Sequence, residues 1–388
     1  MIIKDFSAKS VLDSRKEKTI SITIKTNVGN FSASSPSGSS TGKYEKKPYK
    51  KNIEEEIKTV KKFKDYFSEE DINVFEDLRR IEDILDGFFG ANTFFALESA
   101  ILKALAKEKR KEIWQIVNPN LKKTKFPRLV GNCIGGGKHQ NSSSGEKKPD
   151  FQEFLLIPKT KLVSESFLEM KKRKKEIKSS LEEDKKFRNE KNYEDAFVTS
   201  LNEKEVLEIL KKFKSPLGVD IASSSFYKRK KYHYENPMMK RDSEEQMMYL
   251  SNLIKNFNLF YIEDPFQEDD FEGFSKLLKK FPDRMIVGDD LTTTSHSRLK
   301  KAIEIKSINA VMVKPNQIGS LIEVKEVCEL AKKNNIKIVF SHRSGETDET
   351  ILADLAFGFQ ADFFKSGITG NEREFKIKRL IDIERGLK

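Results

Sequence analysis

Six ionisable residues stand at the ends of six short apolar runs after residue 200 of the chain. They are Asp220, Glu263, Asp289, Lys314, His342 and Lys365. Successive members are 23 to 43 residues apart, which is roughly the length of one strand, one helix and two short loops. A single residue of this kind is typical of a solvated loop, but six in succession indicate strand ends that meet at a shared site.

Three of these residues are carboxylic acids, and their chemistry limits what such a site can hold. If Asp220, Glu263 and Asp289 lie together, they repel one another unless they keep protons, pair with lysines or share a cation. Oxygen ligands without a nearby cysteine favour a hard ion, above all Mg²⁺. Lys314 and Lys365 would line the same mouth. A lysine held beside a divalent cation loses affinity for its proton and can act as a neutral base.

The elements that must position these residues alternate along the second part of the chain. The apolar runs are 217–220, 259–263, 285–289, 310–314, 336–342 and 362–365, with amphipathic helices such as 321–333 between them. Such βα units close into a barrel or wind into an open sheet. Before Pro127 the pattern differs, because residues 19–25 alternate like a half-buried strand and residues 53–105 have helical periodicity. This first part is predicted to be an α+β module.

Composition excludes several classes of protein. Of the 388 residues, 37% are hydrophobic and 35% charged, so the chain can bury a core and is not disordered. Cys133 and Cys328 are the only cysteines, which excludes a disulfide framework and a cysteine-rich zinc site. The first residues lack the features of a signal peptide, and charges interrupt the apolar segment 88–106. We therefore expect a cytoplasmic protein without a membrane partner.

The chain carries a net charge of +12, from 73 basic and 61 acidic residues. Such a surplus attracts polyanions or a small phosphorylated substrate, and it is equally typical of solvated lysine-rich helices. Two basic runs stand out, at 171–175 and 228–234, and the second interleaves aromatic residues as single-strand binders do. Because basic runs usually coat solvated helices and loops, we do not expect a nucleic-acid partner.

Eight short segments occur in a fixed order along the chain. They are Leu12–Arg15, Pro36–Gly42, Phe151–Phe154, Gly218–Ser224, Ile262–Phe266, Ile286–Thr292, Lys314–Gly319 and Ser341–Thr347. In this order and at these spacings, they make the chain similar to the enolase family over nearly its whole length. The resemblance implies an N-terminal α+β capping domain, residues 1–126, and a C-terminal β/α (TIM-like) barrel that carries the active site, residues 127–388.

The resemblance also implies an activity. Enolases are hydro-lyases that reversibly dehydrate 2-phosphoglycerate to phosphoenolpyruvate in glycolysis and gluconeogenesis. The expected partner is therefore a small phosphorylated acid, and the expected cofactor is Mg²⁺, two ions per active site, with the second arriving with the substrate. Departures near Arg15 and a short C-terminus touch regions that enolases use for dimer contacts, so homodimerisation stays open.

Site residues follow from the resemblance position by position. Lys314 matches the base that abstracts the proton, and Glu194 is the counterpart of the acid that assists loss of hydroxide. The first Mg²⁺ would be held by Asp220, Glu263 and Asp289, and the second would be recruited with the help of Ser40. The substrate-binding positions are His139, Gln152, Glu153, His342, Arg343, Ser344 and Lys365. Among these, Arg343 and Ser344 match the phosphate-binding pair and Lys365 the lysine that steadies the substrate carboxylate.

The acid segment departs most from the family pattern. Enolases carry the acid in a glycine-flanked segment, whereas here Glu194 is followed by Asp195 and Ala196. A positive φ at either residue would be strained, and the Asp195 charge is expected to raise the proton affinity of Glu194. These changes keep a second hypothesis open: a catalytically weak or inactive enolase-like protein that acts as a binding or scaffold module through its basic surface.

Overall fold

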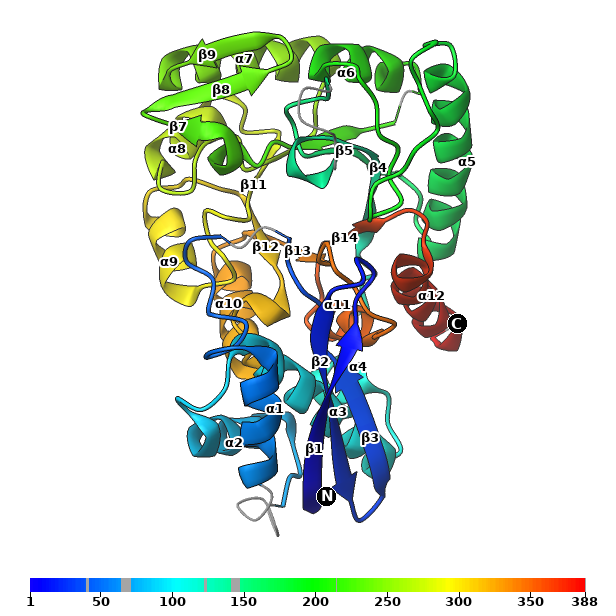
Figure 1. The fold of residues 1–388 in the computed structure, drawn as a ribbon, viewed down its shortest axis with the longest axis vertical. Coiled ribbons are helices and arrows are strands. Elements are labelled where there is room, and N and C mark those ends of the chain that lie inside the picture. The colour runs from blue at the N-terminus through cyan, green and yellow to red at the C-terminus, as the bar shows by residue number, and fades with distance from the viewer. Residues whose placement is uncertain (40–41, 64–70, 122–123, 141–146, 214, 388) are drawn as a thin grey trace.

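The structure is a computed structural model that describes residues 1–39, 42–63, 71–121, 124–140, 147–213 and 215–387. Figure 1 shows two parts along the long axis of the molecule. One end holds a three-stranded antiparallel sheet and helices from the N-terminal region, and the other end holds a closed barrel surrounded by helices. None of the described helices is long and apolar enough to span a bilayer.

The N-terminal part is built on an amphipathic sheet. Its strands are β1 (Ile3–Leu12), β2 (Lys18–Thr26) and β3 (Gly29–Ser34), followed by α1 (Ile53–Lys62), α2 (Leu78–Leu85), α3 (Ala91–Lys109) and α4 (Ile113–Val117). Ile20, Ile22 and Ile24 alternate along β2 and are fully buried, and α3 packs against β2 and β3. The alternation thus has the period of a half-buried strand, as expected. The expected helix at 88–106 is α3, which begins three residues later.

The barrel has eight strands in the order β10-β11-β12-β13-β14-β4-β5-β6. They are β4 (Arg128–Gly135), β5 (Glu153–Leu156), β6 (Leu217–Asp220), β10 (Tyr261–Glu263), β11 (Met285–Gly288), β12 (Ala310–Val313), β13 (Lys337–Ser341) and β14 (Phe363–Gly367). β5 pairs antiparallel with both β4 and β6, and the other neighbours are parallel. The predicted β/α barrel is confirmed, whereas the reversed strand β5 was not foreseen.

Apolar side chains pack inside and outside the barrel. A separate core cluster includes Val130, Leu155, Tyr261, Met312 and Val339, one residue from each of five barrel strands. Helices enclose the barrel from outside: α5 (Val163–Leu181), α6 (Glu203–Lys211), α7 (Ser243–Phe257), α8 (Phe271–Lys280), α9 (His296–Glu304), α10 (Leu321–Lys333), α11 (Ile351–Gly358) and α12 (Asn371–Gly386). The helix predicted at 321–333 is confirmed with the same bounds.

The second basic run forms an unforeseen small sheet. Its strands are β7 (Tyr227–Lys228), β8 (Lys231–Glu235) and β9 (Met238–Arg241). Tyr232 and Tyr234 point into the core and are buried, whereas the lysines and the arginine of the run are exposed. The aromatic rings therefore cannot stack on a nucleic-acid base in this arrangement, as ring-stacking recognition would require.

The two parts of the chain meet through the segment that follows β3, which reaches the barrel strands β12 and β13 (Figure 1). Asn316 Nδ2 donates to Pro36 O at 3.1 Å, and Ser37 and Gly345 form an isolated bridge. α3 also packs against the turn after β12. That residues 1–126 and 127–388 are separate domains stays a prediction, although the first barrel strand begins at Arg128.

Gly319 is expected to be indispensable to this contact. Its φ is +87°, and a Cβ there would lie 2.7 Å from Cα and O of Ala91, the first residue of α3. Gly319→Ala should lower the free energy of unfolding by about 2 kcal/mol or more, from left-handed strain and overpacking. Urea unfolding measures this change. Gly386→Ala, in open space at the end of α12, is the control, and equal unfolding free energies for the two variants would contradict the argument.

Candidate active site

The strand-end residues converge at one mouth of the barrel. Asp220 and Glu263 are the last residues of β6 and β10, whereas Asp289, Lys314 and His342 directly follow β11, β12 and β13. Lys365 lies within β14. A small cavity of about 30 Å³ is lined by nearly all the predicted site residues: His139, Gln152, Glu153, Glu194, Asp220, Asp289, Lys314, His342, Arg343, Ser344 and Lys365. Glu263 lies beside them, fully buried, and Ser40 falls outside the described residues.

Lys365 joins three carboxylates from three neighbouring strands. In the sheet register Glu153 lies opposite Asp220 and Asp220 lies opposite Glu263, because the reversed strand β5 begins at this mouth. The Lys365 ammonium is 2.7 Å from Glu263 Oε2 and 3.1 Å from both Asp220 Oδ2 and Glu153 Oε2. Burial alone would lower its pKa, but Asp220, Glu153 and Glu263 raise the pKa well above the ordinary value. Lys365 is therefore charged.

Lys314 pairs with the third predicted metal ligand. Its Nζ forms a charged hydrogen bond with Asp289 Oδ2, while Thr294 Oγ1 accepts from the Lys314 backbone N at 2.9 Å. Burial would lower the pKa of Lys314, but Asp289 outweighs it and raises the pKa to about 12. The expected loss of proton affinity concerns Lys314 beside a bound cation and stays a prediction, whereas here the ammonium group has a carboxylate partner. The alternative, in which lysines neutralise these acids, fits both ammonium groups. Lys314 pairs with Asp289, and Lys365 pairs with Asp220 and Glu263.

The mouth nevertheless contains more carboxyl groups than these cations neutralise. Asp264 accepts from the backbone N atoms of Asp289 and Asp290 at 3.0 and 2.7 Å. Carboxylate atoms of Asp264, Asp289 and Asp290 lie within 4.8 Å of one another. Burial and Asp289 raise the pKa of Asp290 to about 8, and burial and Asp220 raise the pKa of Glu263 well above its ordinary value.

These residues fit a divalent cation. Crowded, buried carboxyl groups that keep protons at neutral pH are the condition that a bound cation relieves. The donors are oxygen atoms, which suit Mg²⁺. The candidate ligands are the predicted Asp220, Glu263 and Asp289, and the structure adds Asp264 and Asp290 beside them.

Glu194 lies on the opposite side of the mouth between two histidines. Its carboxylate accepts from Asn132 Nδ2 at 2.9 Å and lies 3.5 Å from His139 Nδ1 and 3.8 Å from His342 Nε2. Burial alone would raise the pKa of Glu194, but the His139 cation holds the pKa well below the ordinary value. The expected rise in the proton affinity of Glu194 is wrong, because the His139 charge outweighs burial, and the Asp195 charge is itself paired with Lys174 and Lys191.

The proton of this cluster resides on His139. Burial would lower the pKa of His139, but Glu194 and Glu153 outweigh it and raise the pKa to about 10. The Glu153 carboxylate is 3.3 Å from His139 Nδ1. His342 differs, because burial lowers its pKa well below the ordinary value. One charged and one neutral imidazole therefore flank Glu194.

The predicted phosphate-binding pair is held by residues of the N-terminal part. Arg343 makes a bidentate ion pair with Glu45, with Nη2 3.0 Å from Oε2, and Arg343 Nη1 donates to Asn316 Oδ1 at 3.2 Å. Ser344 Oγ accepts from Ser39 N at 2.6 Å. The Glu45 carboxylate thus occupies the position where an anionic ligand would meet the guanidinium, which helps explain why the cavity is small.

Three site residues were missed by the sequence reasoning. Asp264 and Asp290 directly follow predicted metal ligands, so the paired acids at two strand ends were a signal that could have revealed them. Glu45 had no such signal, because its partner Arg343 is 298 residues away.

Gln152, which was predicted, donates from Nε2 to Asp220 Oδ2 at 3.3 Å.

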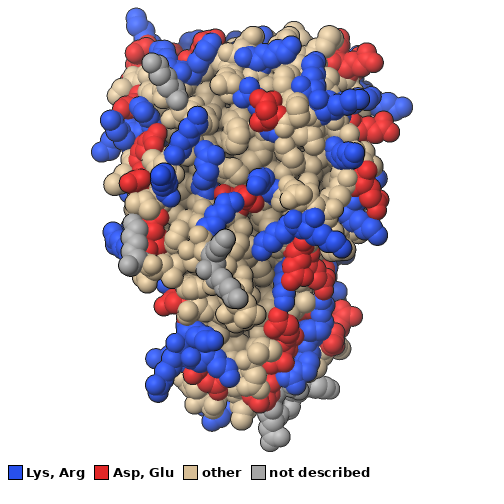
Figure 2. All heavy atoms as spheres, turned by 180° about the vertical axis from the view of Figure 1, so that it is seen from behind, with Lys and Arg blue, Asp and Glu red and all other residues tan. Residues whose placement is uncertain are grey.

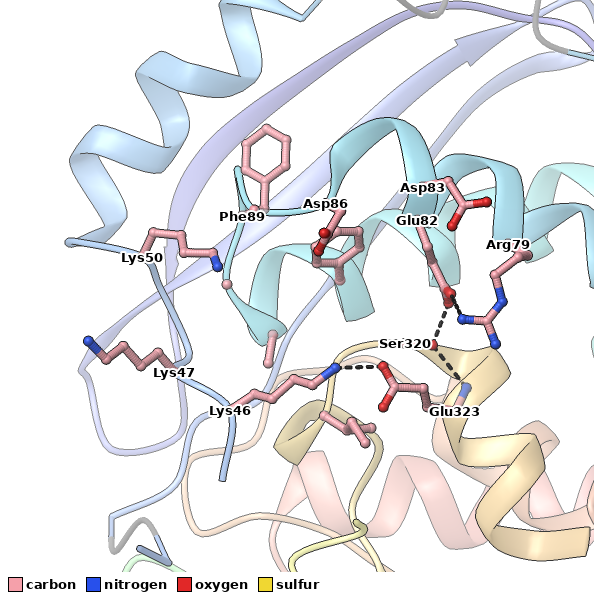
Figure 3. Close-up of a pocket in the computed structure, with 15 residues that line it drawn as sticks. Lys46, Lys47, Lys50, Arg79, Glu82, Asp83, Asp86, Phe89, Ser320 and Glu323 are labelled. Atoms are coloured by element: carbon pink, nitrogen blue, oxygen red, sulfur yellow. Dashed lines mark hydrogen bonds and ion pairs between the residues drawn. The ribbon is translucent and has the colours of Figure 1, made fainter. Parts of the chain in front are cut away.

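A larger cavity of about 410 Å³ lies away from the mouth, between the N-terminal part and α10 (Figure 3). Four of its charged residues form two ion pairs with one another. Lys46 Nζ is 2.5 Å from Glu323 Oε1, and Arg79 Nη1 is 3.0 Å from Glu82 Oε2. The barrel mouth is the stronger candidate site despite its smaller volume, because it gathers the strand-end residues.

Figure 2 shows how charge is distributed on one face of the molecule. Lys and Arg side chains are spread over this face, with Asp and Glu side chains among them. Interspersed charges of this kind are typical of a solvated surface and give little focused attraction for a polyanion.

Comparisons with known proteins agree with this geometry. The family model described as "Enolase, C-terminal TIM barrel domain" matches residues 123–388. A protein of Methanosphaera stadtmanae named enolase is 35% identical, and the match covers 100% of this chain and 97% of that protein. The enolase of Natronomonas pharaonis is 33% identical over 99% of both chains, and that of Methanothermobacter thermautotrophicus is 33% identical over 99% of this chain and 96% of its own.

The two imidazoles at the mouth are expected to titrate differently. In metal-free protein, ring ¹⁵N shifts should report His139 as imidazolium and His342 as neutral between about pH 6.5 and 8, around the ordinary histidine pKa. Folding raises the pKa of His139 to about 10, so its charge stabilises the fold fully below about pH 6.5, and this contribution is lost as pH rises toward 10. His139→Gln assigns the signal. A His139 signal that titrates near the ordinary value would contradict the geometry.

Proposed function

The chain belongs to the enolase family, a family of lyases, and we propose that it reversibly dehydrates 2-phosphoglycerate to phosphoenolpyruvate with Mg²⁺. One observation carries the proposal, namely the set of groups that a single barrel mouth combines. It holds several carboxylates that could bind a metal ion, a lysine, Lys314, that pairs with one of them, Asp289, and an arginine, Arg343, that binds the Glu45 carboxylate. The substrate carries a carboxylate and a phosphate, and the proposed chemistry builds further negative charge on it.

The proposed metal ligands are Asp220, Glu263 and Asp289, with Ser40 as a ligand to a second Mg²⁺ that arrives with the substrate. When bound, Mg²⁺ would stabilise the negative charge that develops on the substrate carboxylate. Enzymes of this superfamily generally use a lysine or histidine base together with Mg²⁺. Lys365, now paired with Glu153, Asp220 and Glu263, would then be available to contact the substrate carboxylate.

Lys314 is the proposed general base, and its reactivity depends on Asp289. In the ion pair the lysine keeps its proton, with a pKa of about 12, and a protonated amine cannot abstract one. If Asp289 turns to a ligand position, Lys314 loses the partner that raises its pKa. Burial and Arg343, which both lower the pKa, then favour the neutral amine.

The second step needs a proton for the departing hydroxide, and the Glu194–His139 pair can supply it. Glu194 is ionised in this structure, and the proton resides on His139, 3.5 Å away. We propose that His139 passes this proton to Glu194 and that Glu194 donates it to the departing hydroxide, which leaves as water, so that the pair acts as the general acid. Asn132 orients the Glu194 carboxylate through its hydrogen bond of 2.9 Å.

The phosphate of the substrate is proposed to bind Arg343 and Ser344 in place of Glu45. A planar guanidinium binds carboxylate and phosphate by the same bidentate geometry. Glu45 therefore marks the anion position and must withdraw when the substrate enters. Gln152, Glu153 and His342 line the same cavity and are proposed as further contacts. In the described residues no specific observation favours the alternative of a non-enzymatic scaffold, so the proposal stays with catalysis.

Removing the proposed base is expected to abolish turnover. Purified protein with 2-phosphoglycerate and Mg²⁺ should form phosphoenolpyruvate, followed by its ultraviolet absorbance, and a chelator should stop the reaction. Lys314→Ala should lower kcat at least about 10³-fold, within the range for loss of a general base. Lys333→Ala, exposed at the end of α10, is the control. Absence of wild-type turnover, with salt-sensitive RNA retention, would favour the scaffold alternative instead.

Mg²⁺ binding at pH 7 is expected to release protons, because the pKa of Asp290 is raised to about 8 and a bound cation displaces the proton of such a carboxyl group. Calorimetric titrations in two buffers of different ionisation enthalpy count the protons released. Asp290→Asn should release up to about one proton fewer, whereas Asp283→Asn, at an exposed position, should match the wild type. Binding without proton release would contradict the proposed crowding of carboxyl groups.

A further inference from the structure

The turn that carries Glu194 is held by a buried lysine on α5. Lys174 belongs to the basic run 171–175, and it alone of the run is buried, at 5% exposure. Basic runs are normally solvated, so its inward orientation requires an explanation. The ammonium group donates to the carbonyl O and to Oδ2 of Asp195 and to Thr369 Oγ1, with 2.9 Å between Nζ and Oδ2.

Asp195 is the residue directly after Glu194, and its conformation is unfavourable. Its φ is 61°, in the left-handed region that side-chain-bearing residues rarely adopt. The turn is closed by Asn192, whose Oδ1 accepts from Glu194 N and Ala196 N at 2.9 and 3.0 Å. Lys191 also pairs with Asp195, but its side chain is 43% exposed. The buried contact of Lys174 is therefore the one that water cannot replace.

The packing around this turn fixes where the Glu194 carboxylate points. A Cβ on Gly367 of β14 would lie 2.7 Å from Glu194 O, and Gly370 approaches Asp195 from the start of α12. On its other side Phe197 bridges to Ile134 of β4. The backbone is thus clamped between α5, β14 and β4, and the Glu194 side chain reaches from this clamp to His139 and His342.

We propose that Lys174 is a positioning residue for Glu194, which it fixes by neutralising and tethering Asp195 in a left-handed turn. The inference rests on the proposed function only for its kinetic consequence. Removing Lys174 alone leaves Asp195 paired with the exposed Lys191, and removing Asp195 alone leaves the buried Lys174 ammonium without its carboxylate. Removing both leaves a turn with neither charge.

Hydrogen exchange of the metal-free protein tests the tether without any reference to activity. In Lys174→Met, amides in the peptide 190–198 should exchange at least about tenfold faster, within the coupling expected for residues of one network. Lys175→Met, one residue along the same helix and exposed, is the matched control. Unchanged exchange in this peptide relative to the control, or acceleration spread over the whole chain, would overturn the proposal.

Kinetics test the consequence for catalysis. Lys174→Met should lower kcat by roughly 10–100-fold with KM changed less than about threefold, as expected for a misplaced catalytic group. The double variant Lys174→Met with Asp195→Gly should recover most of the loss, because it removes both charges and the strain. It also provides a folded test protein if the single variant is unstable. A double variant as impaired as the single one would overturn the proposal, whereas an inactive wild type would refute only the proposed function.

Discussion

The barrel mouth is governed by one electrostatic constraint, the burial of more carboxyl groups than the available cations can neutralise. Lys365 compensates Glu153, Asp220 and Glu263, and Lys314 compensates Asp289. Burial raises the pKa of Asp264 well above its ordinary value, and burial and Asp289 raise the pKa of Asp290 to about 8 although Lys314 opposes this rise. Two ammonium groups therefore hold the positive charge at a site whose ligands suit a divalent ion. The same pairing that stabilises the mouth also keeps the proposed base protonated.

The fold imposes this constraint through register and topology. The reversed strand β5 brings Glu153 to the same end of the barrel as the carboxyl ends of β6 and β10, so three acids lie side by side across three strands. The segment after β3 then closes the mouth, with Glu45 on Arg343 and Ser39 N on Ser344. Because the charges come from both parts of the chain, their arrangement depends on how the N-terminal part docks on the barrel.

Sequence reasoning located the strand ends but not the partners. The apolar runs that end at Asp220, Glu263 and Lys314 predicted both the strands and their common mouth, since parallel strands in βα units must end on one side. Spacing does not determine which lysine pairs with which acid, so the raised pKa of Lys314 was not foreseen. From the missing glycines we expected only that a positive φ in the acid segment would be strained, and Asp195 has such a φ. Lys174 looked like part of a solvated run, because its contact to Asp195 joins segments that no local pattern relates.

The central claim is that the carboxylates of the mouth bind a divalent cation in place of the two ammonium groups. A crystal structure of the protein grown with Mn²⁺, whose anomalous scattering identifies the ion, tests it most directly. We expect an anomalous peak bonded to Asp220, Glu263 and Asp289, with Lys314 Nζ separated from Asp289. A peak elsewhere, or an intact Lys314–Asp289 pair with Mn²⁺ bound, would contradict it.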